Sequence, residues 1–300
     1  IWGGNRLSTH FNYNIPSDNT GEAWVISAHK NGDCLVKNGK FKGMHLSTLW
    51  ENHKELFDYM PGDTFPLLVK IIDAKEDLSI QVHPDDAYAK EHENGSLGKT
   101  ECWYILDCNE ESSIIMGHKA KTKDELKDMI YDSRWTDLLQ ETPINKDDFF
   151  QISSGTVHAI KAGTLILEIQ QNSDITYRLD DYDRLSNGKP RPLHIEKSID
   201  VINCPHNNYI RKSNIKEFEK GRIEELISYQ YYTVRKIQVW DKLTLKQEEP
   251  FSLINVIEGS GTIDGRAIQK GDSFILPKGY GDYTLSGEMT LILSFPGTMS

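Results

Sequence analysis

Residues 148–158 read Asp148-Phe-Phe-Gln-Ile-Ser-Ser-Gly-Thr-Val-His158, and 124 positions later the chain reads Asp272-Ser-Phe-Ile-Leu-Pro-Lys-Gly-Tyr-Gly-Asp282. An Asp, a Phe and a Gly recur at the same spacing in both segments, and the apolar alternation that follows keeps the same offset. Self-similarity of this kind indicates two copies of one structural unit. We therefore predict two related β-domains.

Most of the chain consists of short runs of β-branched and aromatic residues separated by Gly, Asn, Asp and Pro, a pattern typical of sandwiches and barrels. Two stretches instead repeat apolar residues at helical spacing, so we expect helices near 45–60 and 123–140, the second as an insert. We predict a mainly β protein with a few helices. Its first domain would span residues 1–215 and a smaller second domain residues 216–300.

Composition narrows the classes of partner. A net charge of −11 would repel a phosphate backbone, so we expect no nucleic-acid partner. No apolar run approaches the roughly 20 residues that cross a bilayer, so we expect no membrane partner. Four cysteines without a CxxC pair fit a reducing cytosol, which predicts a cytoplasmic protein. A monomer and a homodimer both stay open.

Four residues form a candidate metal site. Gln81 and His83 are two apart in a predicted strand, so their side chains leave the same face. Glu101 opens a later strand, and His158 ends a turn before a third. Two imidazoles, a carboxylate and an amide oxygen suit a zinc ion that keeps an open position. Each histidine could instead be an ordinary core or surface residue.

The second copy has lost these residues. Asp282 stands where the first copy has His158, and Ser252 falls near the place of Glu101. We therefore predict that the second domain is a degenerate copy without metal.

The constellation resembles the cupin pattern, in which a Q-x-H strand, a later Glu and a P-x-G-x-x-H turn converge on one metal. The first turn here lacks the Pro, and the gap before Glu101 is longer than in an ordinary cupin. In these departures the chain is similar to the type I mannose-6-phosphate isomerases in their compact bacterial form. The motifs that carry the resemblance are Gln81-Val-His83-Pro-Asp-Asp86, Gly98-Lys-Thr-Glu101, Gly155-Thr-Val-His158-Ala and Asn172-Ser-Asp174-Ile-Thr-Tyr-Arg178.

The resemblance implies two jelly-roll cupin barrels and one zinc ion per chain on Gln81, His83, Glu101 and His158. Gln81 could instead orient a bound water. It also implies a sugar site and an interconversion of mannose 6-phosphate and fructose 6-phosphate through a cis-enediolate, by proton transfer between C1 and C2. The residues implied to line that site are Lys99, Glu168 and Arg178.

Glu168 is the first candidate for the base, because burial in its apolar strand would raise its pKa. It could instead be a structural partner of Arg178. Arg178 would place a permanent positive charge beside the sugar oxygens. Lys99 lies two residues before a ligand and could hold a sugar hydroxyl, or could be an exposed loop residue.

Two further residues are candidates for binding the sugar phosphate. Asp174 precedes Arg178 by four residues and could orient it, or could serve a turn. Arg184 offers a guanidinium fork for phosphate, although the Asp-rich run 180–183 lies beside it.

Two other functions fit the same residues. One is a zinc- or iron-dependent cupin that acts on another sugar or a small acid. The other is a carbohydrate-sensing or storage protein with two cupin domains and no turnover. Chelator-sensitive turnover of a sugar phosphate would distinguish the isomerase from the non-enzymatic alternative.

Overall fold

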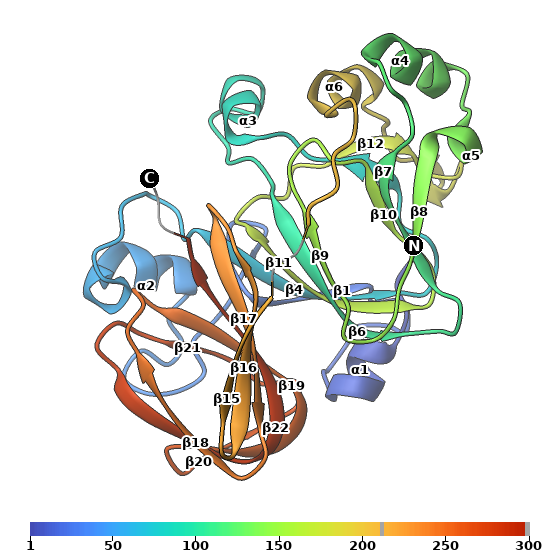
Figure 1. Cartoon of the computed structure of the whole chain (residues 1–300). Helices are drawn as coiled ribbons and strands as arrows, with labels where there is room; N and C mark the ends of the chain where they lie inside the picture. Colours follow the sequence, from blue (N-terminus) through green and yellow to red (C-terminus); the bar gives the residue numbers. More distant parts are fainter. Residues whose placement is uncertain (211–212, 298–300) are drawn as a thin grey trace. The chain divides into compact units, whose positions relative to one another are not determined.

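The computed structural model describes residues 1–210 and 213–297 (Figure 1). Its contacts divide the chain into two compact units. One unit holds Ile1–His10, Asn14–Ala23 and Val69–Tyr209, and the other holds Phe11–Tyr13, Trp24–Leu68 and Ile210–Ser300. By its contacts, the segment from Trp24 to Leu68 thus belongs to the same unit as the C-terminal part of the chain. The predicted domain division at residue 215 stays a prediction.

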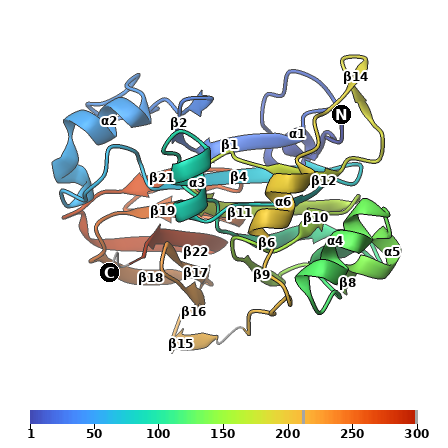
Figure 2. The same cartoon turned by 90° about the horizontal axis from the view of Figure 1, so that it is seen from above.

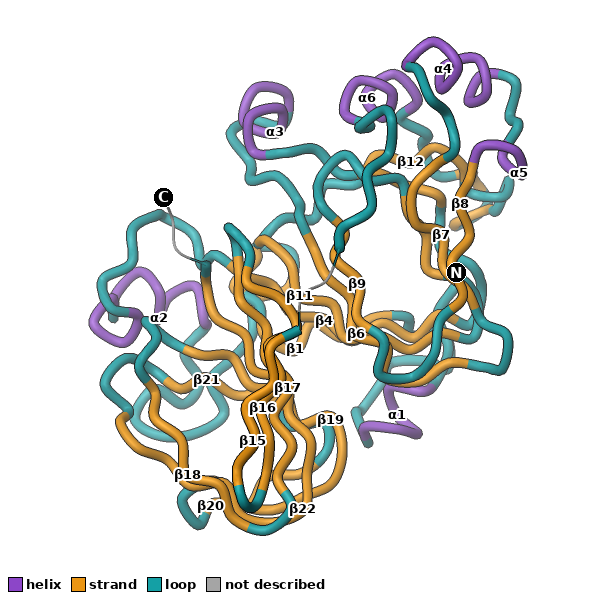
Figure 3. Tube along the Cα trace, viewed as in Figure 1, coloured by secondary structure: helices purple, strands orange, loops and turns teal. Residues whose placement is uncertain are grey.

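Strands make up most of the regular structure of both units, and helices are few and short (Figure 3). This confirms the predicted mainly β class. None of the helices in the described part of the chain is long and apolar enough to cross a membrane.

Two five-stranded sheets make up most of the first unit. One sheet has the strand order β1 (Glu22–Ile26), β4 (Leu67–Ala74), β11 (Thr164–Gln171), β6 (Glu101–Cys108) and β9 (Phe149–Ile152). The other has the order β12 (Tyr177–Asp180), β5 (Ile80–Val82), β10 (His158–Ile160), β7 (Ser113–His118) and β8 (Leu139–Pro143). A small hairpin joins β13 (Leu185–Ser186) to β14 (Lys189–Pro190).

Apolar side chains from both sheets form one shared core, as in a jelly roll. Alternation along each strand explains this, because every second residue points inward. Inward-facing members of this core are Ile72, Trp103, Ile105, Ile114, Met116, Ile152, Ile160 and Ile166.

Helices cover the outer face of the β12-β5-β10-β7-β8 sheet (Figures 1 and 2). They are α4 (Lys123–Tyr131), α5 (Trp135–Leu138) and α6 (Ile195–Val201), and the unit also contains α3 (Asp86–His92) and most of α1 (Arg6–Phe11). Both α4 and α5 lie in the range where helical spacing predicted an insert. Thr122 caps α4 by accepting a hydrogen bond from the Glu125 amide, and Leu126 is buried against the sheet.

The second unit is built on one eight-stranded sheet. Its main order is β15 (Asn214–Phe218), β16 (Gly221–Ser228), β17 (Tyr232–Val239), β22 (Gly281–Pro296), β19 (Ser252–Ile263) and β20 (Arg266–Gln269). β18 (Lys242–Gln247) pairs with β22, and β21 (Ser273–Leu276) pairs with β19. An apolar cluster of buried side chains packs against this sheet.

The segment before residue 69 adds helices to the second unit. They are α2 (Leu46–Asn52) and the 3-10 helix η1 (Lys54–Phe57), and both lie in the range 45–60 predicted to be helical. The short strands β2 (Ala28–His29) and β3 (Gly32–Asp33) precede them. Trp50 packs against the aromatic rings of Phe57, Phe65 and Phe251.

Candidate active site

Neighbouring strands bring the predicted ligands together in the first unit. Gln81 lies on β5, and its Cα is paired with that of His158, the first residue of β10, on one side and with that of Arg178, on β12, on the other. His83 directly follows β5, and Glu101 is the first residue of β6 in the facing sheet. The ligand atoms of the two histidines and Glu101 lie within 4.8 Å of one another, and all three side chains are buried.

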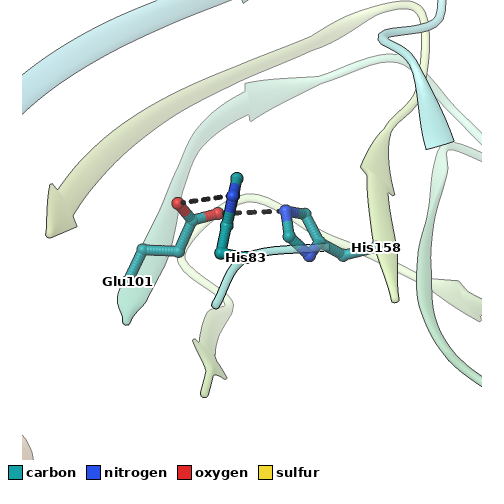
Figure 4. A group of neighbouring side chains, drawn as sticks. All are labelled: His83, Glu101 and His158. Carbon is teal, nitrogen blue, oxygen red and sulfur yellow. Dashed lines mark ion pairs between the residues drawn. The ribbon is translucent and has the colours of Figure 1, made fainter. Parts of the chain in front are cut away.

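Each oxygen of the Glu101 carboxylate is paired with one of the two imidazoles (Figure 4). Its Oε2 is 3.5 Å from His83 Nε2, and its Oε1 is 3.4 Å from His158 Nε2. Ligands bound tetrahedrally at about 2.0–2.1 Å from a zinc ion lie roughly 3.3–3.4 Å apart. The spacing of each imidazole nitrogen from the carboxylate therefore fits ligands of one zinc ion.

In both imidazoles Nε2 carries no hydrogen and offers a lone pair. His83 Nδ1 lies 2.8 Å from the carbonyl oxygen of Ile175, and His158 Nδ1 lies 2.8 Å from that of Thr156. A carbonyl oxygen only accepts, so each Nδ1 carries the hydrogen and each Nε2 is a potential ligand. Burial, followed by the charge of Lys99, lowers the pKa of His83 to about 3, and burial also lowers the pKa of His158. Neutral imidazoles are the form that binds metal.

The pKa of Glu101 is held well below its usual value. Burial alone would raise it, but the positive charge of Lys99 and the neighbouring imidazoles outweigh burial. Lys99 Nζ lies 2.6 Å from Glu101 Oε2 and donates to His83 Nε2 at 3.1 Å.

Gln81 is the fourth member of the cluster. Its Nε2 lies 3.3 Å from His158 Nε2, and its Oε1 accepts a hydrogen bond from Ser79 Oγ at 3.2 Å. A rotation of the amide by 180° would place Oε1 toward the cation and Nε2 toward the serine hydroxyl, which can also accept. Gln81 thus fits either of its predicted roles.

Glu168 lies in β11 directly opposite Trp103 on β6. Its Oε1 accepts a hydrogen bond from Trp103 Nε1 at 3.2 Å, and its Oε2 is 3.5 Å from Lys70 Nζ. Burial, and then the charge of Glu101, raises the pKa of Glu168. The structure therefore gives Glu168 the buried environment that the sequence predicted, with Lys70 as its ion-pair partner.

Arg178 is half-buried, and its Nε is buried without a hydrogen-bond partner. Its strand is held by the pairing with Gln81 and by two hydrogen bonds with His194: the His194 amide donates to the Arg178 carbonyl oxygen, and the Arg178 amide donates to His194 Nδ1. Burial, and then the charge of Arg191, lowers the pKa of Arg178. Asp174 is exposed and lies four residues before Arg178.

Arg184 is engaged with protein groups. Its Nη2 lies 2.6 Å from Asp181 Oδ1, and its Nη1 donates to the carbonyl oxygen of Asp77. The same buried Asp181 accepts two hydrogen bonds from Arg191. These contacts anchor the loop that follows β12, and the predicted phosphate contact of Arg184 stays a prediction.

Sequence reasoning did not identify Ser79, Lys70 or Trp103 as site residues. Ser79 precedes Gln81 by two positions and Trp103 follows Glu101 by two, so strand periodicity alone would have placed both beside a ligand. Lys70 lies in β4, where all eight residues are buried and six of them are apolar. A lysine in such a strand needs a carboxylate partner, which was the available signal.

A cavity of about 380 Å³ lies beside the turn that precedes His158. Met116, which pairs with His158 across β7 and β10, contributes to its wall together with Ser153, Thr156 and His206. The described residues that line it include none of the predicted site residues. We therefore do not place the sugar in this cavity.

Comparisons with known proteins agree with this geometry. The family model "Phosphomannose isomerase type I, catalytic domain" matches residues 1–104, and "Mannose-6-phosphate isomerase, cupin domain" matches residues 222–296. The chain is 50% identical to mannose-6-phosphate isomerase ManA of Bacillus subtilis, over 98% of this chain and 95% of that protein. It is 46% identical to the mannose-6-phosphate isomerase of Streptococcus mutans, over 98% and 94%.

Solved structures give the same result. The crystal structure of the mannose 6-phosphate isomerase from Bacillus subtilis matches with a TM-score of 0.97 and 47% identity, covering 98% of this chain and 96% of that one. A putative mannosephosphate isomerase from Archaeoglobus fulgidus shares the fold, with a TM-score of 0.76 at 20% identity over 99% and 94%. With the His-Glu-His cluster and full-length identity near one half, the chain belongs to the type I mannose-6-phosphate isomerase family.

Proposed function

We propose that this chain interconverts mannose 6-phosphate and fructose 6-phosphate with the help of one zinc ion held by His83, Glu101, His158 and Gln81. The observation that carries the proposal is the buried His-Glu-His cluster, with Lys99 and Glu168 beside it, in a chain 50% identical to a named mannose-6-phosphate isomerase. The two nitrogen ligands and one carboxylate are a donor set that zinc accepts.

The reaction moves a proton from C2 of the aldose to C1 and passes through a cis-enediolate. A bound zinc ion would act as a Lewis acid on the sugar oxygens, an effect worth several kcal/mol. Glu168 would take the C2 proton as a carboxylate and return it to C1. Its raised pKa suits this role, because a carboxylate with a higher pKa is the stronger base.

Two cations would support the charge on the sugar oxygens. Lys99 lies beside the ligands, and the carboxylates of Glu101 and Glu168 raise its pKa against the effect of burial. It is therefore protonated and can donate a hydrogen bond to a sugar oxygen. The buried Nε of Arg178 has no hydrogen-bond partner, so it could donate a hydrogen bond to a substrate oxygen. We propose that Asp174 and Arg184 contact the remainder of the sugar phosphate.

The remaining features of the proposal concern the whole chain. The four cysteines are free thiols, which supports a reducing, cytoplasmic location. We propose the first domain as the catalytic one and the second as a degenerate copy. Either a monomer or a homodimer is compatible with a site whose described residues all come from one chain.

A coupled assay tests this function. Purified protein should convert mannose 6-phosphate to fructose 6-phosphate, lose activity with a chelator and regain it with zinc. His158→Ala should lose bound zinc and turnover. His118→Ala is the matched control, because His118 is also buried but contacts the carbonyl oxygen of Asn203. Full zinc content and turnover in His158→Ala would refute the site.

A further inference from the structure

The indole N–H of Trp103 lies between the two carboxylates of the site. Trp103 Nε1 is 3.1 Å from Glu101 Oε1 and 3.2 Å from Glu168 Oε1. This follows from strand geometry, because Glu101 and Trp103 leave the same face of β6 while Glu168 is directly opposite Trp103 on β11. All three side chains are buried.

The two buried carboxylates share one hydrogen-bond donor. An indole has a single N–H and no acceptor, so both carboxylates depend on the same hydrogen. Each carboxylate has a lysine near its other oxygen: Lys99 at 2.6 Å for Glu101 and Lys70 at 3.5 Å for Glu168. The indole is thus the one group that hydrogen-bonds to both acids among the described contacts.

We propose that Trp103 is a positioning residue that fixes the base carboxylate of Glu168 relative to the cation site. The inference rests on the proposed function, in which Glu101 is a ligand and Glu168 moves the proton. A shared hydrogen limits how far the two oxygens can separate. A sugar whose oxygens face the cation then has its C1 and C2 within reach of Glu168 each time it binds. Proton transfer depends steeply on such placement.

Packing and hydrogen bonding of Trp103 can be separated. Its ring also contacts the His158 imidazole edge-on, with centroids 5.5 Å apart. Trp103→Phe keeps an aromatic ring at this position and removes only the donor. Trp50→Phe is a matched control, because Trp50 is equally buried in the second unit and donates to the carbonyl oxygen of Gly62.

Two measurements test the proposal: zinc affinity by competition with a chromophoric chelator, and kcat and KM at saturating zinc. For Trp103→Phe we expect zinc affinity to fall about 10- to 100-fold, as is typical when a group behind a metal ligand is lost. At saturating zinc, kcat should stay at least about tenfold below wild type while KM for mannose 6-phosphate changes less than about twofold. Trp50→Phe should match wild type in both.

Recovery of wild-type kcat once zinc is saturating would overturn base positioning, because the indole would then serve Glu101 alone. Wild-type zinc affinity and kcat together would overturn the whole proposal. If Trp103→Phe does not fold, as judged by circular dichroism, β-(3-benzothienyl)alanine at position 103 replaces it, since this isostere has sulfur in place of N–H. The zinc titration needs no substrate, so a wild-type protein without isomerase activity would refute the proposed function separately.

Discussion

Two glutamates in one buried site have pKa values shifted in opposite directions. Lys99 and the imidazoles lower the pKa of Glu101 against the effect of burial, whereas burial and the charge of Glu101 raise that of Glu168. Opposite shifts of this kind separate the roles of paired carboxylates. These directions fit the proposed roles, with Glu101 ionised as a ligand and Glu168 as the stronger base.

The rate should therefore depend on pH through Glu168. A base acts only when ionised, so kcat should fall as the pH drops through the pKa of Glu168. Because that pKa is raised, the acid limb should lie above pH 4.5, the ordinary value. Glu168→Gln should reduce kcat by roughly 10²- to 10⁴-fold and abolish the limb. The measurement is a pH profile of kcat at saturating zinc, and a limb at or below the ordinary value would contradict it.

Arg184 permits a test of the phosphate contact. Its guanidinium also binds Asp181 and the carbonyl of Asp77, so Arg184→Gln should reduce thermal stability and, as the proposed phosphate contact is lost, raise KM for mannose 6-phosphate by about tenfold. Both are measured on the same preparation, by thermal unfolding and steady-state kinetics. A loss of stability with KM changed less than about twofold would contradict direct binding of the substrate phosphate.

At the scale of elements, the local sequence pattern predicted individual strands and turns, but it did not predict which strands pack beside one another. The spacing of Gln81 and His83, the strand beginning at Glu101 and the turn before His158 were all readable, because strand periodicity and turn residues are local properties. Which strands become neighbours is not local. The pairing of β5 with both β10 and β12, and of Trp103 with Glu168, follows from sheet topology. The role of the indole was therefore not predictable from spacing alone.

The predicted insert offers an element-scale test of stability. Thr122 accepts a hydrogen bond from the Glu125 amide and so caps α4, which packs on the outer face of the sheet that carries the site. Thr122→Ala should lower the free energy of unfolding by about 0.5–2 kcal/mol, whereas Thr122→Ser should be near neutral. Urea denaturation measures both. Turnover should not change, and an equal loss in the serine variant would rule out capping.

At the scale of the molecule, the chain should bind one zinc ion. Within residues 1–210 and 213–297, the only group of three or more His, Cys, Asp or Glu side chains with metal-site spacing is His83, Glu101 and His158. In the second unit, Asp282 is exposed and lies opposite Lys246 in the β18–β22 pairing. Elemental analysis should therefore give one zinc per chain, and two would contradict the degenerate second domain.

Removal of the bound zinc ion should also lower the stability of the protein. A ligand that binds only the folded protein stabilises it by about 2.7 kcal/mol at a concentration 100 times its Kd. Chelation should therefore lower the midpoint of unfolding of wild type. His158→Ala, which cannot hold the ion, should unfold at the same midpoint with or without chelator.

The site draws on β5, β6, β10, β11 and β12, which are spread between residues 80 and 180 of the chain. No short fragment can contain it. During synthesis Gln81 and His83 leave the ribosome long before His158 and Arg178, so the nascent protein has no working centre until the segment through Arg178 has been made. A chain that stalls or is cut before that point would be catalytically silent, whatever part of it has already folded.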